Sequence, residues 1–308
     1  MLTNFLTVLE QVVILFLLMA LGFLFNKSGK LSRETCGKLS DIVVTIVAPC
    51  VIVKSFIRTY DPAQLRYLLY ALGLSLLIHT VMAILSKVVL RHSDRKKRSV
   101  MVFASVFSNA GFIALPLAEA LLGADGVFYS AAYIVIFNIF MWSFGILEMS
   151  GDRSMVTPKK LLVSPGIIGV VIGMLLFITS FRPPYAAMAV LEHVSALNVP
   201  LPMFIVGYYL AEADILHAFR NRELYFPMIL RLLLFPALAL GLLMLLRIDS
   251  TLSLTLLISV SAPVGATCSM FSEKFGGDTE LSVKLVAVST LLSILTMPVL
   301  VALAQSLL

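Results

Sequence analysis

Two short polar stretches interrupt apolar segments of this chain, and their residue types suit the binding of a small anion. They read SNAGFIALP at residues 108–116 and SAPVGATCS at residues 261–269, so each combines hydroxyl or amide side chains with glycine and proline. Proline removes a backbone donor and clashes with the preceding helical turn. In lipid, such broken backbone persists only inside protein or beside a water-filled cavity. Paired interruptions in two halves of a chain are the sequence pattern that indicates a transporter binding site.

Each interruption predicts a helix that ends and starts again near the centre of a membrane. A helix N-terminus carries unpaired N–H groups and about half a positive charge, so two of them facing one cavity favour an anion. Pro116 suits the first turn of a restarted helix, where its missing N–H costs nothing. The alternative is that glycine and proline only kink packed helices, but the matching depth of the two interruptions favours a site. The candidate substrate-binding residues are Ser108, Asn109, Gly111, Pro116, Asn198, Pro263, Val264, Gly265 and Thr267, with Ser261 and Ser269 as further hydrogen-bonding residues.

The surrounding composition is that of an all-α, multi-spanning (polytopic) membrane protein. Of the 308 residues, 60% are hydrophobic and only 13% are charged, whereas soluble domains carry about 25% charged residues. A helix of about 20 apolar residues crosses the hydrocarbon core, and ten windows of that length are present. The predicted spans cover 5–25, 40–57, 66–90, 100–122, 127–147, 162–181, 187–210, 225–246, 252–272 and 281–305.

Basic residues concentrate in the loops that follow the odd-numbered spans, which predicts that these loops are cytosolic. The densest run is at residues 95–98, and anionic lipid of the bilayer is its expected partner. This topology signal accounts for the net charge of +6 without a nucleic acid partner. Both termini are then expected outside, and the expected location is the plasma (cytoplasmic) membrane of a bacterium.

The ten spans divide into two sets of five, residues 1–150 and 161–308. Because five is odd, the second set enters the membrane from the opposite side. An offset of 154 residues places Asn109 opposite Pro263 and Gly111 opposite Gly265. We therefore expect two inverted five-helix repeats, with the broken helices four and nine crossing each other.

The interruptions also resemble those of a known family. The run SNAGFIALPL at 108–117 is similar to the asparagine-glycine-proline crossover of the auxin efflux carrier family, which includes bacterial malate-permease-like proteins and the plant PIN carriers. The run SAPVGAT at 261–267 resembles its second crossover, VPLPMFIVG at 199–207 resembles its span-seven motif, and Pro49 falls where its second span carries proline. The resemblance extends over the whole chain in length and span count.

This resemblance implies a scaffold made of helices 1, 2, 6 and 7, and a moving transport unit made of helices 3–5 and 8–10. It also implies secondary transport of small organic anions such as carboxylates by an elevator-type movement, with substrate at the crossover. A homodimer through the scaffold helices is a further expectation. The plant carriers present a carboxylate and a lysine on span three, where this chain offers only His79, so the coupling ion is not carried over.

Ionisable residues inside spans are costly and are functional candidates. His79 titrates near physiological pH, so it is the candidate for a coupling proton; a neutral histidine bonded to a neighbouring helix is the alternative, and sodium coupling is also open. Glu119 is interpreted as a solvated helix end, with a place at the outer mouth of the cavity as the alternative. Arg231 is interpreted as a side chain that extends to the membrane surface. Asn138 is interpreted as an interhelical hydrogen-bonding residue. Glu192 and His193 are interpreted as interfacial.

Enzyme chemistry has little support. The sequence has no metalloprotease, nucleophile-elbow or phosphate-binding-loop motif, and its three cysteines lack metal-like spacing. We expect no cofactor, no metal and no catalytic residue. The competing function is a membrane ligand sensor that keeps the carrier fold and signals through a partner; a channel is third, because no ring of one polar type is evident.

Overall fold

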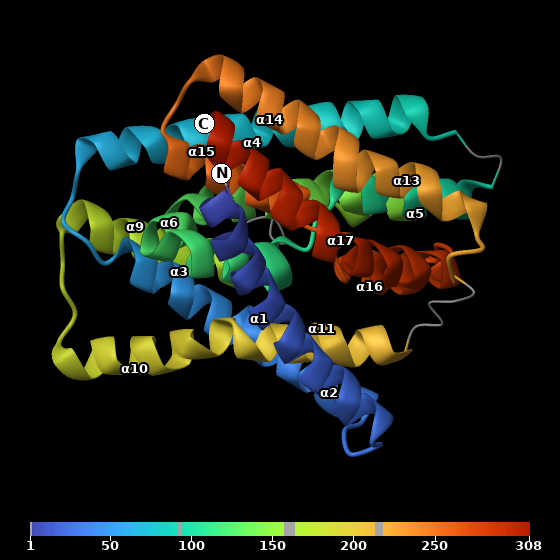
Figure 1. Ribbon diagram of the computed structural model, residues 1–308, viewed down its shortest axis with the longest axis horizontal. Coiled ribbons are helices and arrows are strands. Elements are labelled where there is room, and N and C mark those ends of the chain that lie inside the picture. Colours follow the sequence, from blue (N-terminus) through green and yellow to red (C-terminus); the bar gives the residue numbers. More distant parts are fainter. Residues whose placement is uncertain (1, 92–93, 157–163, 213–217) are drawn as a thin grey trace.

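The computed structural model describes residues 2–91, 94–156, 164–212 and 218–308 of the chain, and these are helical with no strand (Figure 1). The first half of the chain contains α1 (Leu2–Lys27), α2 (Arg33–Ile42), η1 (Val43–Val47), α3 (Ala48–Phe56), α4 (Pro62–Val89), α5 (Arg95–Val106), η2 (Ala110–Ala114), α6 (Leu115–Phe140), η3 (Met141–Gly145), α7 (Ile146–Ser150) and η4 (Arg153–Met155). The second half contains α9 (Pro165–Thr179), α10 (Tyr185–Ser195), η5 (Ala196–Asn198), α11 (Pro200–Glu212), η6 (Arg222–Leu224), α13 (Tyr225–Ile229), η7 (Leu230–Leu234), α14 (Phe235–Leu246), α15 (Ser250–Ser261), α16 (Thr267–Phe275) and α17 (Thr279–Leu307).

The described residues include seven helical stretches that are long and apolar enough to cross a membrane, and the shorter apolar helices α9 and α15. These stretches are Glu10–Lys27, Arg33–Phe56, Pro62–Val89, Ala110–Ser150, Tyr185–Glu212, Arg222–Leu246 and Thr279–Leu307. The Ala110–Ser150 stretch is not one straight helix, because Gly123 adopts φ 61° and ψ −145° inside α6. Only glycine occupies such a conformation readily. The prediction of an all-helical membrane protein is confirmed, while ten spans in an inverted repeat stay a prediction.

Three π-helical turns precede prolines at the same spacing. The turns η1, η2 and η7 end at Val47, Ala114 and Leu234, two residues before Pro49, Pro116 and Pro236. A proline ring clashes with the carbonyl four residues earlier, and the wider π turn relieves that crowding. The helical run after the first interruption starts with the π turn at Ala110, and α6 follows from Leu115. Pro116 lies in the first turn of α6, as expected for a proline near a helix start, and the π turn extends the helical run ahead of it.

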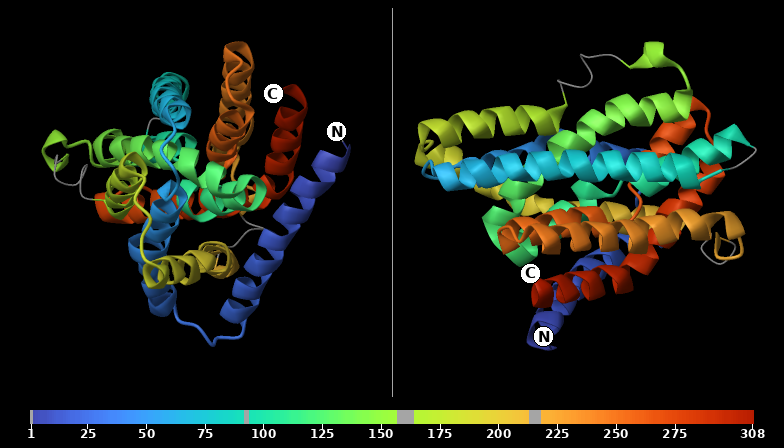
Figure 2. Two further views of the ribbon diagram at one scale, coloured as in Figure 1. Left: turned by 90° about the vertical axis from the view of Figure 1, so that its left-hand side faces the viewer. Right: turned by 90° about the horizontal axis from the view of Figure 1, so that it is seen from above.

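Most helix contacts lie within two groups, which also contact each other, α1 against α17 and α3 against α6. In one group, α1 packs along α11, α2 also packs on α11, and α3 packs against α9 and α10. In the other, α4 packs on α5 and α6, and α15 packs on α6, α14 and α17. Figure 1 shows α10 and α11 along its lower edge with α1 crossing α11, and Figure 2 shows that the two ends of the chain lie near each other.

Glycines allow α1 and α11 to approach closely. A Cβ on Gly207 would lie 1.8 Å from the Met19 carbonyl oxygen, and a Cβ on Gly22 would lie 1.9 Å from the Phe204 carbonyl oxygen. Small residues at such contacts are typical of helix packing in membranes.

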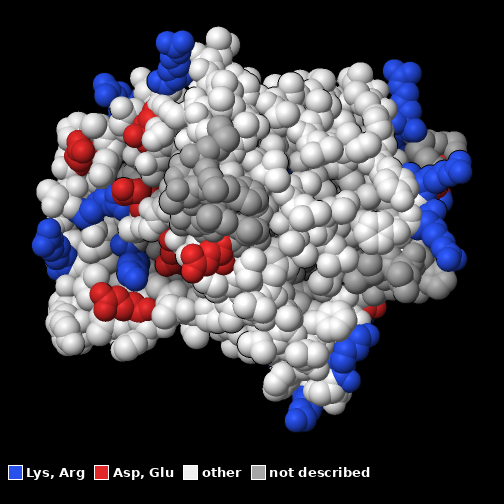
Figure 3. Space-filling model, in the orientation of Figure 1, with Lys and Arg blue, Asp and Glu red and all other residues white. Residues whose placement is uncertain are grey.

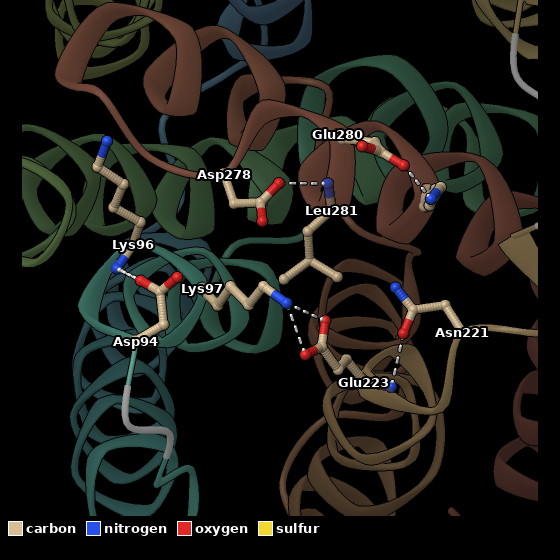
Figure 4. A network of polar contacts seen from close by, with 9 residues as sticks. Asp94, Lys96, Lys97, Asn221, Glu223, Asp278, Glu280 and Leu281 are labelled. Carbon is tan, nitrogen blue, oxygen red and sulfur yellow. Dashed lines mark hydrogen bonds and ion pairs between the residues drawn. The ribbon is translucent and has the colours of Figure 1, made fainter.

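On the face shown in Figure 3, most charged side chains lie toward the two ends of the long axis, and a wide area between them shows no charged side chain. At one end, the starts of α5, η6 and α17 lie close together, and an ion pair joins α5 to η6 (Figure 4). Asp94 and Asp278 cap α5 and α17 through the N–H groups of Lys96 and Leu281. The Lys97 ammonium donates to both Glu223 oxygens at 2.8 and 3.1 Å, and this contact raises the pKa of Lys97. The network joins segments from both halves of the chain.

Candidate functional site

The two interrupted segments contact each other through their backbones. The Asn109 N–H donates to the Pro263 carbonyl oxygen at 2.7 Å, and the Gly265 N–H donates to the Phe107 carbonyl oxygen at 3.0 Å. These two bonds make Ser108 and Val264 an isolated antiparallel bridge. The end of α5, the start of η2, the end of α15 and the start of α16 thus meet at one place. We call residues 107–109 and 262–266 the crossing.

Side chains on both segments support this backbone pairing. Asn109 is the N-cap of η2, because its Oδ1 accepts from the Phe112 N–H at 3.3 Å. The Ser108 hydroxyl lies 3.3 Å from the Tyr133 hydroxyl. The Val264 N–H donates to Ser289 Oγ of α17 at 3.1 Å. The crossing therefore leaves few free backbone groups, as an interrupted helix inside a membrane requires.

Gly265 in the crossing and Gly111 just after its first segment have opposite surroundings. A Cβ on Gly265 would lie 2.9 Å from the Ser108 carbonyl oxygen and 3.0 Å from Thr267 Oγ1, so Gly265 permits close backbone approach. A Cβ on Gly111 would meet nothing within 4 Å, and Gly111 has no left-handed conformation. Gly111 lies in the first turn after the break, and the chain turns at residues 107–109. The crossing is open on the Gly111 side and closed on the Gly265 side.

The remaining predicted residues of the second interruption differ in what they contact. Ser261 donates to the carbonyl of Ile258 in its own helix at 3.2 Å, which occupies its hydroxyl hydrogen. Thr267 opens α16, and its enclosed Oγ1 has no hydrogen-bond partner among the described residues. Ser269 lies in the first turn of α16 and is half-buried. Thr267 is thus the member of this set whose hydroxyl is enclosed without a hydrogen-bond partner among the described residues.

Asn198 lies at a different break, the short η5 turn between α10 and α11. Its Nδ2 donates to Glu119 Oε2 at 2.8 Å, and Asn198 is fully buried. Glu119 is half-buried, so its interpretation as a solvated helix end is wrong: it follows Pro116 on a helix that faces the α10–α11 break. The structure brings Asn198 to α6, where its side chain bonds to Glu119 and to no residue of the crossing.

Arg231 lies in different surroundings from those that the sequence predicts. Its side chain is fully buried, and its Nη1 donates to the carbonyl oxygens of Ser105 at 3.2 Å and Val106 at 3.0 Å. The expectation that it extends to the membrane surface is wrong, because it binds the last carbonyls of α5 directly before the crossing. A cation is stabilised there by the negative end of the helix dipole. The sequence does contain a signal for this residue: an arginine within a long apolar run is a functional candidate.

His79 is enclosed among aromatic rings. Its Nδ1 lies 2.8 Å from the Ser75 carbonyl oxygen of its own helix, and its Nε2 has no partner among the described residues. The rings of Tyr133 and Phe140 lie 4.8 and 5.3 Å away between centroids. Its role as a coupling-ion site stays a prediction.

Three other polar residues are placed as follows. Asn138 donates to the carbonyl of Ile134 within its own helix at 2.8 Å, so this bond is intrahelical and not the expected interhelical one. Glu192 and His193 near the end of α10 are exposed. No group of three or more His, Cys, Asp or Glu side chains able to hold a metal ion occurs in the part of the chain that the structure describes.

The chain is similar to known membrane transport proteins. A family model described as "Membrane transport protein" matches residues 7–301. An uncharacterized transporter of Methanothermobacter thermautotrophicus is 22% identical over 293 residues, which cover 94% of this chain and 96% of the relative. The match runs through both segments of the crossing and through Arg231.

Proposed function

This chain belongs to the membrane transport protein family, which comprises the auxin efflux carrier-like transporters. On this basis we propose that it is a secondary carrier of small organic anions such as carboxylates. The substrate binds at the crossing, near Asn109, Gly111 and Thr267. The driving force is an ion gradient or the gradient of the substrate itself.

Buried Arg231 is the observation that carries this proposal. A charge inside a membrane costs on the order of 3 kcal/mol or more, and a buried charge ordinarily has an ionic partner. Arg231 has no carboxylate partner among the described residues: two carbonyls of α5 accept from its Nη1, and the Tyr133 hydroxyl is a further polar neighbour. Its Nε and Nη2 atoms have no acceptor in close contact among these residues. A positive charge with spare donors, held next to the crossing, suits a carboxylate that arrives when the crossing opens.

The packing of the helices supports an elevator-type movement. The group of α1, α2–α3, α9 and α10–α11 corresponds to the expected scaffold, and α4–α7 with α13–α17 corresponds to the expected transport unit. Both segments of the crossing lie in the second group. In this proposal the second group moves as one body and carries the substrate with it. The division into two inverted five-helix repeats, with broken helices four and nine crossing, belongs to the same proposal.

Flux through liposomes that contain the purified protein tests the function. Radiolabelled mono- and dicarboxylates are supplied at two pH values, with and without sodium. A carrier gives saturable uptake and counterflow, so preloading with unlabelled substrate accelerates uptake of the label. Binding without flux would identify a ligand sensor, and flux without saturation or counterflow would identify a channel. Either result would overturn the proposal.

Cysteine labelling tests the proposed topology. In a background without Cys36, Cys50 and Cys268, Lys96→Cys is expected to react with a membrane-impermeant maleimide only after permeabilisation, because basic loops face the cytosol. Ser250→Cys, at the opposite end of the transport unit, is expected to react in intact cells. The reverse pattern would contradict the orientation.

Substitution of Asn109 tests whether its amide contacts the substrate. Asn109→Ala is expected to weaken carboxylate binding by about 5- to 150-fold, since an unpaired polar partner costs about 1–3 kcal/mol. It also removes the cap on η2, which costs about 1 kcal/mol of stability. Asn109→Ser is the matched control, because serine caps a helix about as well but lacks the amide. Equal carboxylate binding by parent and Asn109→Ser would show that Asn109 acts only as a cap.

A further inference from the structure

The contact between Glu119 and Asn198 leaves one hydrogen-bonding atom unsatisfied. Asn198 Nδ2 donates to Glu119 Oε2 at 2.8 Å. Asn198 is fully buried, and its Oδ1 has no donor among the described residues. Burial of an acceptor without a donor is unfavourable, so the surroundings of Asn198 Oδ1 favour a neighbouring group that can donate to it.

An ionised Glu119 does not supply the missing donor, because a carboxylate only accepts hydrogen bonds. Turning the Asn198 amide around does not help either. Oδ1 would then face the carboxylate, and the NH₂ group would lose its acceptor. A single proton on Glu119 resolves the mismatch. The carboxylic acid then donates its O–H to Asn198 Oδ1 while its other oxygen accepts from Nδ2, which closes a ring of two hydrogen bonds.

We propose that Glu119 and Asn198 form a proton-binding site. When the proton is bound, their two hydrogen bonds hold α6 against the break between α10 and α11, and we call this contact the latch. This inference rests on the proposed carrier function and names its coupling ion. Protonation forms one O–H bond on the Glu119 carboxylate, and deprotonation returns that proton to water. Glu119 belongs to the proposed transport unit and Asn198 to the proposed scaffold, so the latch spans the two bodies that must move past each other. Loss of the proton leaves a single hydrogen bond and weakens the latch.

The surroundings favour a proton over a metal cation. A hard metal cation takes about six oxygen ligands, whereas this contact offers the oxygens of one carboxylate and one amide. Asp125, the other carboxylate of α6, is paired with Arg58. The other charged side chains and histidines on elements packed against α6, η5 or α11 are Glu10 and Lys27 of α1, Arg33, Glu34, Lys38 and Asp41 of α2, Lys54 of α3, Arg66, His79 and Lys87 of α4, Glu192 and His193 of α10, and Glu212 of α11.

Infrared difference spectroscopy of the full chain in liposomes tests the site without any substrate. The parent is expected to show the C=O band of a protonated carboxylic acid at low pH, and this band is expected to disappear as the pH rises. Glu119→Gln should lack the band and should still fold, because glutamine forms the same two-bond ring with Asn198. Asp125→Asn and His79→Gln are the matched controls, and both should keep the band.

Asn198→Ala keeps Glu119 and removes its partner, so it tests the pairing even if Glu119→Gln does not insert. Its carboxylic acid band should move to the position of an acid without a hydrogen-bonded C=O. An identical band in Glu119→Gln, or an unshifted band in Asn198→Ala, would overturn the proposal. A band that sodium ions remove at constant low pH would assign the site to sodium instead. Loss of the band in His79→Gln alone would assign the proton-binding site to His79 instead.

The coupling itself is read from flux. In parent liposomes, carboxylate uptake should change with an imposed pH gradient, and in Glu119→Gln it should become independent of that gradient. If parent flux does not depend on the pH gradient but the infrared band changes with pH as expected, proton coupling is refuted. The proposed carrier function is then unaffected. No flux under any condition, with the band present, would refute the carrier function and leave the proton site standing.

Discussion

Replacement of Arg231 by methionine is expected to abolish carboxylate transport while the solubilised protein stays as stable as the parent or becomes more stable. Exchange of buried charges for apolar residues of similar volume is neutral or stabilises by about 1–4 kcal/mol. The Ser105 and Val106 carbonyls lose their donor, which offsets about 1–3 kcal/mol. Affinity is expected to fall on the order of 100-fold or more, because removal of one member of a buried charged pair costs about 2–5 kcal/mol.

Binding titration and thermal unfolding in detergent, measured on the same preparations, check this prediction. Arg66→Met is the matched control, since Arg66 of α4 is exposed, and it should bind carboxylates like the parent. Arg231→Lys keeps the charge but lacks the planar fork of donors, so its affinity should fall between parent and Arg231→Met. Parental affinity in Arg231→Met would mean that the anion is held elsewhere.

The second large effect is expected at the contact between α1 and α11. Gly207→Ala places a Cβ against the Met19 carbonyl oxygen, which lies 1.8 Å from its ideal position. Because the obstacle is backbone, the two helices must separate. We expect a loss of about 3 kcal/mol or more, at the upper end of the range for overpacked interiors. Thermal unfolding in detergent and the yield of monodisperse protein measure the loss.

Two other glycines provide the controls. A Cβ on Gly73 in α4 or on Gly241 in α14 would meet nothing within 4 Å. Alanine at either position should stabilise its helix by up to about 1 kcal/mol. Gly22→Ala faces the Phe204 carbonyl oxygen across the same contact, so adding it to Gly207→Ala should cost less than the sum of the two single losses. A stable Gly207→Ala protein would show that α1 and α11 are free to shift.

The sequence predicts the location of the crossing because its signals are local. Proline, glycine and polar residues in an apolar run indicate where a helix breaks, and the structure pairs Asn109 with Pro263 as the offset between the halves suggests. The start of the restarted helix is not predictable in the same way. A π turn at Ala110–Ala114 accommodates Pro116, and no simple residue pattern specifies such a turn.

The surroundings of Arg231 and Glu119 could not be predicted from the sequence, for a different reason. Hydropathy gives a residue an approximate depth in the membrane but does not say which neighbour its side chain faces. Arg231 is buried because the last carbonyls of α5, some 125 residues earlier in the chain, provide its acceptors. Glu119 is half-buried because the break at Asn198 lies against α6. Both environments arise from tertiary packing, which a single sequence does not show.

The crossing has a consequence for how the protein is made. During synthesis, the segment 107–109 leaves the ribosome long before the segment 262–266 that pairs with it. Arg231, which binds the end of α5, also arrives later. Until then the Phe107 carbonyl and the Asn109 N–H lack the partners that lipid does not supply. We therefore expect the first half of the chain to lack these hydrogen bonds in the membrane until the second half is inserted and supplies them.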